Sequence, residues 1–204
     1  MSTSDRIPLQ EAIEHAEAFR GLFVGCWSTW TIAGSIRRKR QTIGDIEHVI
    51  LPIFTEPERD LLGQISRPPV TLIRRRVDDL LADGRVTLHR YGETGTTRNG
   101  EWYIGLDYCG RQHEIFMARP ENFGCILSIR TGSADFSKGL VTRMMHYGFK
   151  QTDGHLHRSR ERGRLELVNC PDEATFFAAA GLKVDEWPPE RREAFPTHGL
   201  HSHT

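Results

Sequence analysis

Apolar residues recur at helical spacing in several parts of the chain, and each of these parts is predicted to be a helix. The first covers residues 7–23 and ends before Gly25. The second places apolar residues on one face between positions 73 and 81 and is capped by Gly84. Further helical patterns cover residues 123–128, 136–147 and 172–180.

Strand-like patterns lie between these helices. Residues 29–33 and 46–53 are rich in β-prone residues. A meander of three strands is predicted at residues 86–91, 102–108 and 112–118. Arg119-Pro120 then marks a change of character, after which helices dominate. This order predicts an α+β fold with two lobes that meet near residue 120. Residues 196–204 are predicted to be a loose tail.

The composition is that of a folded globular protein. Hydrophobic residues make up 38% of the 204 positions and charged residues 26%, a balance that excludes a disordered chain. No apolar run approaches the roughly 20 residues that cross a bilayer, and the polar N-terminus is not a secretory signal. The cysteines show no metal-binding spacing and are interpreted as reduced thiols in the core or partly buried. We therefore expect a cytoplasmic protein without a membrane partner.

Charge alone does not indicate a nucleic-acid partner, because the formal net charge is zero. The basic residues are nevertheless clustered, at residues 37–40, 74–76 and 158–164. Each cluster fits a solvated surface as well as a nucleic-acid contact, and the sequence leaves both interpretations open.

The segment from position 32 to position 52 holds the residues with the clearest chemistry. Gly34 and Ser35 follow a predicted strand as a tight turn, where backbone N–H groups and a hydroxyl can approach phosphate oxygens. Arg37 and Arg38 add guanidinium groups, whose planar forks pair well with phosphate. These residues together predict a phosphate-binding turn.

Two carboxylates follow this turn. Asp45 and Glu47, two positions apart, would share one face of a strand. Like charges held together are unfavourable without a cation between them, so the pair indicates a divalent-metal site. A pair of metal ions can clamp the attacking and leaving oxygens of a phosphoryl displacement. A third carboxylate from a neighbouring strand would complete the site, and Glu114 and Asp107 are the candidates.

The pattern Gly-Ser-x-Arg-Arg-x5-Gly-Asp-x-Glu at residues 34–47 resembles the palm signature of family X (DNA polymerase beta-like) DNA polymerases. Glu114, followed by Arg-Pro-Glu-Asn-Phe-Gly at residues 119–124, is similar to the family's third catalytic strand and its turn into the thumb. Asp107 lacks this context, so Glu114 is preferred. Thr-Gly-Ser at residues 131–133 matches the family's turn beside the incoming nucleotide. The resemblance covers roughly residues 7 to 193.

This resemblance implies an α+β fold that combines a nucleotidyltransferase-type palm, a mixed sheet with flanking helices, with a small α/β thumb. The palm and its N-terminal helix would take residues 1–120 and the thumb residues 121–195, without the family's lyase and fingers domains. The implied activity is that of a DNA polymerase, a nucleotidyltransferase that adds nucleoside monophosphates from dNTPs to a primer 3′-hydroxyl. Its partner would be primer–template or gapped DNA, its oligomeric state a monomer, and its cofactor two Mg²⁺ ions, for which Mn²⁺ is expected to substitute.

The resemblance also implies roles for individual residues. The catalytic carboxylates and metal ligands would be Asp45, Glu47 and Glu114. The nucleotide would be bound by Gly34, Ser35, Arg38, Gly44, Arg130, Thr131 and Gly132, and the DNA by Lys138. Glu114 stands where the family's aspartate accepts the proton of the attacking hydroxyl. We therefore expect it on the strand beside the one that carries Asp45 and Glu47, with its carboxylate facing theirs.

The chain departs from the family at several positions. Glutamate replaces aspartate at two of the three acidic positions, and a displacement of about 1 Å can cost ~10²-fold in rate. Arg130 replaces an aromatic residue beside the sugar. Ser137 and Val141 replace side chains that contact the new base pair and the template, although Val141 also fits a core position. We therefore expect a repair-like enzyme of low fidelity with a weak preference for dNTPs over rNTPs.

Two other functions are left open. A nucleotidyltransferase acting on a non-nucleic-acid acceptor would share the same palm residues, and a DNA-binding module could have lost catalysis through the glutamate changes. Elsewhere, Trp27, Trp30 and Trp102 are expected in the core, His155 and His157 on the surface, and His198, His201 and His203 in the tail.

Overall fold

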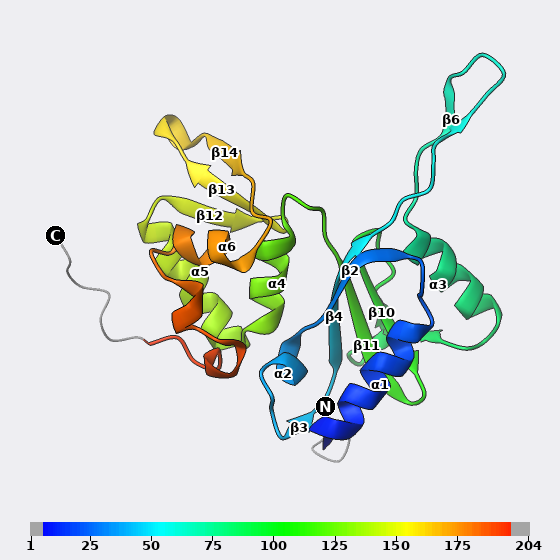
Figure 1. Cartoon of the computed structure of the whole chain (residues 1–204), viewed down its shortest axis with the longest axis horizontal. Coiled ribbons are helices and arrows are strands. Elements are labelled where there is room, and N and C mark those ends of the chain that lie inside the picture. Colours follow the sequence, from blue (N-terminus) through cyan, green and yellow to red (C-terminus); the bar gives the residue numbers. More distant parts are fainter. Residues whose placement is uncertain (1–5, 197–204) are drawn as a thin grey trace.

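The computed structural model describes residues 6–196 and has an α+β architecture around a five-stranded mixed sheet (Figure 1). The strand order is β2-β4-β11-β10-β7. The strands are β2 (Trp27–Ile32), β4 (Ile46–Pro52), β7 (Thr87–Leu88), β10 (Tyr103–Tyr108) and β11 (Arg111–Met117). β4 and β11 are parallel, and the other neighbours are antiparallel. The predicted meander is confirmed, because β7, β10 and β11 are successive antiparallel neighbours in this sheet.

Helices α1 (Leu9–Gly21) and α3 (Leu72–Ala82) cover one face of the sheet (Figure 1). Phe19 of α1 and Ile73 of α3 are fully buried in one core with Ile115 of β11. The apolar periodicity of both helices is therefore explained by this packing. α1 begins two residues later than predicted because Ile7–Pro8 form a short strand, β1, that pairs with β3 (Thr42–Ile43).

The opposite face of the sheet meets the second half of the chain. Val49 of β4 and Phe116 of β11 pack there against Leu127 of helix α4 (Phe123–Thr131). We call residues 6–118 the first lobe and residues 119–196 the second lobe. A functional side chain on this face of the sheet therefore points toward the junction of the two lobes.

The second lobe has a core of its own, in which helices pack on a three-stranded antiparallel sheet. Its elements after α4 are α5 (Ala134–His146), β12 (Phe149–Thr152), β13 (His155–Ser159), β14 (Leu165–Val168) and α6 (Glu173–Ala179). The Thr-Gly-Ser turn separates α4 from α5, and Ser133 caps α5 by accepting a hydrogen bond from the Phe136 N–H at 3.1 Å. The helices predicted on both sides of this turn are confirmed.

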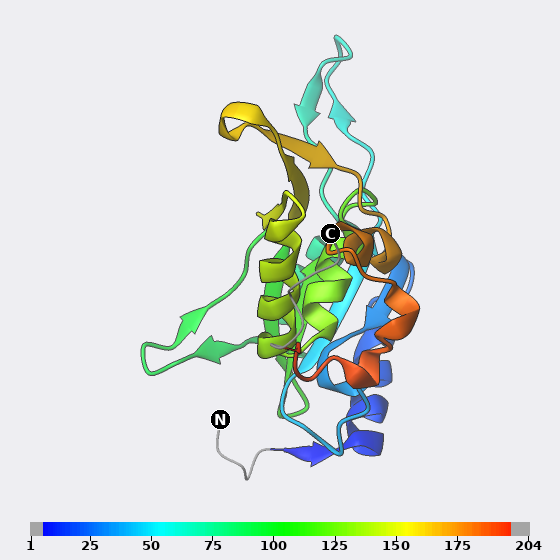
Figure 2. The ribbon, with the colours of Figure 1, turned by 90° about the vertical axis from the view of Figure 1, so that its left-hand side faces the viewer.

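Two hairpins of the first lobe were missed by the sequence patterns. β5 (Glu58–Arg59) and β6 (Ile65–Arg67) form an arm that projects from the lobe (Figures 1 and 2), with exposed Leu61 and Leu62 between its strands. β8 (Arg90–Tyr91) and β9 (Thr96–Thr97) form a second hairpin inside the predicted meander. Both consist of very short strands, which leave too few positions for an alternating pattern.

The burial of the tryptophan, cysteine and histidine side chains agrees with the sequence predictions at some positions and differs at others. Trp30 is buried and Trp27 packs against the same core, as predicted, while Trp102 is half-buried at its edge. Cys109, predicted to be buried or partly buried, is exposed in the turn between β10 and β11. His155 and His157, predicted on the surface, are half-buried. Nearly all of the predicted tail, with its three histidines, lies outside the described residues. No helix in the described part of the chain is long and apolar enough to cross a membrane.

A chain of buried rings crosses the first core. The Trp30 Nε1–H donates to His48 Nδ1 at 3.0 Å, which leaves the proton of His48 on Nε2, 3.1 Å from His113 Nδ1. Phe19 stacks on both imidazoles. Burial lowers the pKa of His48 well below its usual value and the pKa of His113 to about 3. Both rings are therefore neutral in the folded protein.

These histidines predict a loss of stability in mild acid. Because their pKa values are depressed on folding, their contribution is fully present above pH ~6.5 and is lost as the pH falls, at roughly 1.4 kcal/mol per pH unit for each ring. Urea unfolding of the wild type and of a His48→Phe/His113→Phe variant between pH 7 and pH 5 measures this. As the pH falls, the free energy of unfolding should decrease more steeply for the wild type than for the variant. An equal decrease in the two proteins would contradict the assignment of both buried histidines as neutral.

Candidate active site

Glu47 and Glu114, two of the three predicted carboxylates, share the sheet face that meets the second lobe. β4 and β11 lie side by side, and Glu47 is paired with Glu114 in their register. Paired residues on neighbouring strands share a face of the sheet, so the expected position of Glu114 is confirmed. Asp45 departs from the expectation, because it lies in a bend one residue before β4 begins. Strand alternation therefore does not set the direction of its side chain.

Electrostatics link the three carboxyl groups. Burial, followed by the charge of Asp45, raises the pKa of Glu47 to about 8. Burial, followed by the charge of Glu114, raises the pKa of Asp45. The nearby Arg130 and Arg38 act on Glu47 in the opposite direction. Mutual repulsion of this kind is relieved by a cation placed among the carboxylates.

Glu114 is held by three donors at a single oxygen. Its Oε1 accepts hydrogen bonds from the Tyr103 hydroxyl at 2.7 Å, the Tyr91 hydroxyl at 2.9 Å and the Gln112 Nε2 at 2.9 Å. Burial raises the pKa of both tyrosines, so their hydroxyls stay protonated and donate. Among the described residues, Oε2 of Glu114 accepts no hydrogen bond. The orientation of Glu114 is thus fixed while one oxygen is left for other chemistry.

The β8–β9 hairpin explains how Tyr91 reaches this carboxylate. Gly105 lies opposite Glu114 in the β10–β11 register. A Cβ at Gly105 would meet the Tyr91 hydroxyl at 2.2 Å, so only glycine leaves room for that ring. Asp107, the other candidate for the third carboxylate, is engaged elsewhere through a 2.7 Å hydrogen bond with His89 Nδ1.

The donor set fits a divalent cation in its chemistry. Mg²⁺ prefers carboxylate oxygens, and Asp45, Glu47 and the second oxygen of Glu114 supply them. The geometry is less complete, because no group of three or more His, Cys, Asp or Glu side chains within residues 6–196 is arranged to hold a metal ion. Some movement of these carboxylates would have to accompany metal binding.

Gly34 allows Glu47 to reach its position. Gly34 is the first residue of the short helix α2 (Gly34–Arg37) and has a φ of +58°, which favours glycine. A Cβ at this residue would lie 2.1 Å from Oε2 of Glu47. The glycine of the predicted phosphate turn therefore also makes space for a carboxylate. Ser35 follows it in α2, and Gly44 lies in the same bend as Asp45.

Substitution of Gly34 tests this contact. Gly34→Ala should destabilise the protein by both backbone strain and displacement of Glu47, whereas Gly84→Ala, at a φ of +67° with nothing within 4 Å, should add strain alone. The strain is about 1–2 kcal/mol, and the overpacking adds about 1–3 kcal/mol at Gly34. Urea unfolding gives both values. Equal losses at the two glycines would show that the contact with Glu47 costs nothing.

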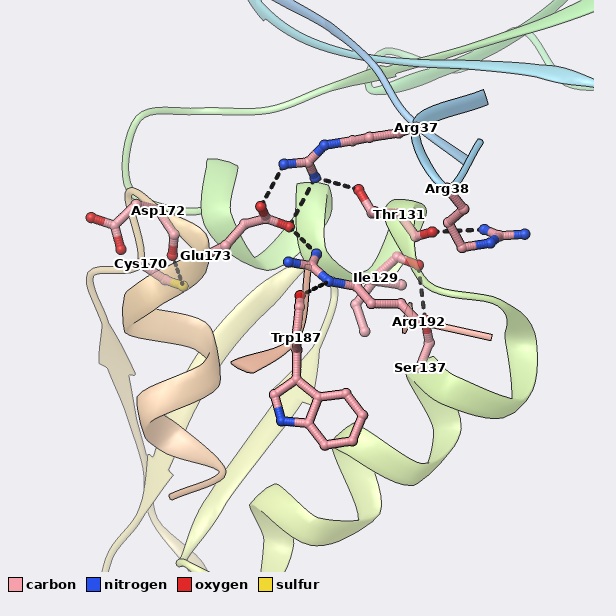
Figure 3. Close-up of polar contacts among 10 residues, drawn as sticks. All are labelled: Arg37, Arg38, Ile129, Thr131, Ser137, Cys170, Asp172, Glu173, Trp187 and Arg192. Atoms are coloured by element: carbon pink, nitrogen blue, oxygen red, sulfur yellow. Dashed lines mark hydrogen bonds and ion pairs between the residues drawn. The ribbon is translucent and has the colours of Figure 1, made fainter. Parts of the chain in front are cut away.

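An ion-pair network joins the two lobes beside this site (Figure 3). Arg37 of α2 donates two hydrogen bonds to Glu173 of α6, at 3.0 and 2.6 Å, and a third to the Thr131 hydroxyl at 2.6 Å. Glu173 also accepts a hydrogen bond from Arg192, which is 1% exposed. Arg192 in turn donates to the Trp187 carbonyl at 2.8 Å. We call Arg37, Glu173 and Arg192 the interlobe network.

Arg38, expected to bind phosphate, also contacts the second lobe. It donates to Glu193 at 2.8 Å. It also donates to the Thr131 carbonyl at 2.6 Å (Figure 3). A pocket of about 480 Å³ lies beside it, lined mainly by Arg38, Lys39, Arg40, Glu190 and Glu193. The glutamates balance part of the positive charge, so an anion entering this pocket would compete with them for the guanidinium groups.

The remaining predicted residues lie at the junction or on α5. Arg130 stacks over the Phe116 ring, with its guanidinium carbon 3.8 Å from the ring centroid. Gly132 has no space for a Cβ, which would lie 2.7 Å from the Ser137 hydroxyl. Lys138 is exposed. Val141 packs partly against the core of the second lobe, which favours the core interpretation of this residue.

Several residues of the site were missed by sequence reasoning. Tyr103 and Gln112 occupy the same sheet face as Glu114, and the two-residue period of the strands, which puts Gln112 on the face of Glu114, was a usable signal. Tyr91, Glu173 and Arg192 had no such signal, because their partners are distant in the chain. A comparison with known proteins adds no assignment: the chain matches neither a protein-family model nor a curated protein sequence.

Proposed function

We propose that the chain is a divalent-cation-dependent nucleotidyltransferase with a family X palm and thumb, which adds nucleoside monophosphates from dNTPs to the 3′-hydroxyl of DNA. In this proposal the first lobe is the palm and the second lobe the thumb. The single observation that carries the proposal is the pairing of Glu47 and Glu114 on the sheet face between the lobes, with Glu47 against the Gly34 turn and Asp45 near enough for its charge to interact with both.

The carboxylates would act together. Asp45 and Glu47 would hold Mg²⁺, with Oε2 of Glu114 as a further ligand. When bound, the metal supplies positive charge that stabilises the phosphate oxygens of the transition state. Glu114, fixed by its tyrosine hydroxyls, would orient the acceptor hydroxyl and accept its proton. Most of the rate enhancement would come from positioning and charge neutralisation.

The triphosphate would enter on the side of α2. The backbone of Gly34 and Ser35 borders the carboxylates there, and the pocket beside Arg38 supplies three cationic side chains. Arg38 would exchange Glu193 and the Thr131 carbonyl for phosphate oxygens. Nucleotide binding would then loosen one contact between the lobes while the interlobe network keeps them joined.

A transfer assay with labelled dNTPs tests this proposal. Recessed and gapped primer–templates are incubated with each dNTP and Mg²⁺ or Mn²⁺, and primer extension is measured. We expect extension that requires metal, and no extension with either metal on either substrate would contradict the proposal. Label transferred instead to a protein or small-molecule acceptor would support the alternative transferase. DNA binding without nucleotide binding would support the DNA-binding module.

Arg130 leads to a prediction about the sugar. It stands where the resemblance places an aromatic residue against the sugar. Its guanidinium can make room for a 2′-hydroxyl or donate a hydrogen bond to it. We expect dNTPs to be preferred over rNTPs by less than about tenfold, below the ~10² that a steric pocket achieves against an added hydroxyl. Single-nucleotide insertion kinetics measure this ratio. Arg130→Phe should raise the preference for dNTPs. Strong rejection of rNTPs by the wild type would show that another residue excludes the 2′-hydroxyl.

A further inference from the structure

A second pocket opens at the junction of the lobes, away from the one beside Arg38. Its volume is about 440 Å³, within the range of small-ligand sites. The first lobe contributes Trp102 and Phe116, and the second lobe contributes Arg119, Ile129, Arg130 and His155. Asn122, Gln151 and Asp153 also line it, so the pocket combines apolar walls with polar groups of both signs, as many pockets for organic ligands do.

Two arginines give this pocket a cationic rim. Arg119 stacks on Trp102 at 4.6 Å and Arg130 on Phe116 at 3.8 Å, measured from guanidinium carbon to ring centroid. Neither guanidinium makes a hydrogen bond or ion pair with another residue in the part of the chain that the structure describes. A guanidinium whose only contact is with a ring keeps its N–H donors free, and such donors suit the paired oxygens of a phosphate group.

His155 adds an unsatisfied donor. The Arg119 backbone N–H donates to Oδ1 of Asn122 at 2.7 Å, which fixes the amide so that its Nδ2 donates to Nε2 of His155 at 3.3 Å. The imidazole proton is then on Nδ1, because one nitrogen of a neutral ring accepts and the other donates. That Nδ1 is buried and has no partner. A buried donor without an acceptor is costly, and a water or a ligand in the pocket would relieve that cost.

The position of this pocket relative to the carboxylates suggests its ligand. The Arg38 pocket borders Thr42 of β3, which precedes β4 in the chain. The Glu47–Glu114 pair lies near the start of β4, and Phe116 of the second pocket lies two positions further along β11. In-line transfer brings donor and acceptor to the reacting phosphorus from opposite sides. With the triphosphate on the Arg38 side, the second pocket lies on the acceptor side.

We propose that this pocket is a phosphate subsite for the acceptor strand, in which Arg119 and His155 hold a backbone phosphodiester near the reacting 3′-end, while Arg130 remains with the sugar of the incoming nucleotide. This inference rests on the proposed function for the identity of the strand. The anion recognition itself rests on the pocket. Arg119 is a positioning residue of this subsite and does not touch the carboxylates assigned to catalysis.

Trp102 provides a direct reporter of the pocket. The full chain is labelled with 5-fluorotryptophan, and the Trp102 ¹⁹F signal is assigned by its loss in Trp102→Phe. The dinucleotide d(TpT), dTMP, inorganic phosphate and thymidine are titrated in the presence of EDTA, so that metal-dependent transfer plays no part. We expect d(TpT) to shift the Trp102 signal to saturation and thymidine to leave it unchanged.

Two variants sharpen the result. Arg119→Gln should weaken d(TpT) binding about tenfold or more, as expected for a charged hydrogen-bond pair, and Arg75→Gln, an exposed arginine of α3 outside the pocket, should not change it. Equal binding of thymidine and d(TpT), or an unaffected Arg119→Gln, would overturn the subsite. Binding of dTMP or inorganic phosphate without binding of d(TpT) would overturn its assignment to a strand. A failed transfer assay with intact d(TpT) binding would overturn the proposed function alone.

Discussion

Asp45→Asn should abolish nucleotidyl transfer while leaving the protein folded. The substitution removes a charged ligand from the proposed metal site but keeps the size of the side chain. We expect kcat/KM to fall by at least about 10³-fold, equivalent to about 4 kcal/mol of transition-state stabilisation. Because the pKa of Asp45 is raised by burial and by Glu114, loss of its charge should not reduce stability. Primer extension and urea unfolding of the same preparation measure both effects.

Asp107→Asn is the matched control. Asp107 is also a half-buried aspartate, but it lies in β10 and its carboxylate bonds to His89. Transfer should stay within about threefold of the wild type, because a side chain that touches no reacting group contributes little to the barrier. Equal loss of activity in the two variants would show that the carboxylate group has been assigned wrongly.

Glu173→Ala should cause the largest loss of stability. Glu173 lies between Arg37 and the fully buried Arg192, so its removal leaves two cations without their partner. Breaking a buried ion pair from one side costs about 3–5 kcal/mol. Unfolding in urea, followed by circular dichroism, gives the value. Glu166→Ala is the control, since Glu166 pairs with Arg160 on the surface and exposed pairs contribute only about 0–1 kcal/mol.

The same network predicts a dependence on pH. Burial acts to raise the pKa of Glu173, but the hydrogen bonds from Arg37 and Arg192 outweigh it and hold the pKa below its usual value. The stability that Glu173 contributes is therefore present above the unfolded pKa of about 4.3 and is lost as the pH falls through the folded value. The difference in stability between wild type and Glu173→Ala should shrink below pH ~4. A difference that stays constant there would contradict a charged Glu173.

Much of the fold follows from local patterns. The helices α1 and α3 bury the apolar faces that their spacing predicts, and the meander of β7, β10 and β11 follows from β-prone runs between turns. The neighbourhood of Glu47 and Glu114 was predicted from the resemblance. It is confirmed by the parallel pairing of β4 and β11, two strands with more than fifty residues between them.

The rest depends on contacts that no local pattern encodes. Glu173 is an ordinary first-turn residue of α6 in sequence, yet it joins Arg37, 136 positions away. Arg38 was expected to bind phosphate, but no local pattern predicted its contacts with Glu193 and the Thr131 carbonyl of the second lobe. The position of Tyr91 over Gly105 depends on a hairpin too short to detect. Ion pairs and close contacts between segments far apart in the chain set these features. Such contacts depend on the folded arrangement and leave no local pattern in the sequence.

Crystals soaked with a non-hydrolysable dNTP analogue and Mn²⁺ test the central claim most directly. Anomalous diffraction at the manganese edge locates the ions without reference to any assumed site. The account predicts manganese within ligating distance of Asp45 and Glu47, about 2.0–2.2 Å for oxygen ligands of such an ion, with the triphosphate against Gly34, Ser35 and Arg38. Manganese and triphosphate bound elsewhere, or a nucleotide bound without metal at these carboxylates, would contradict it.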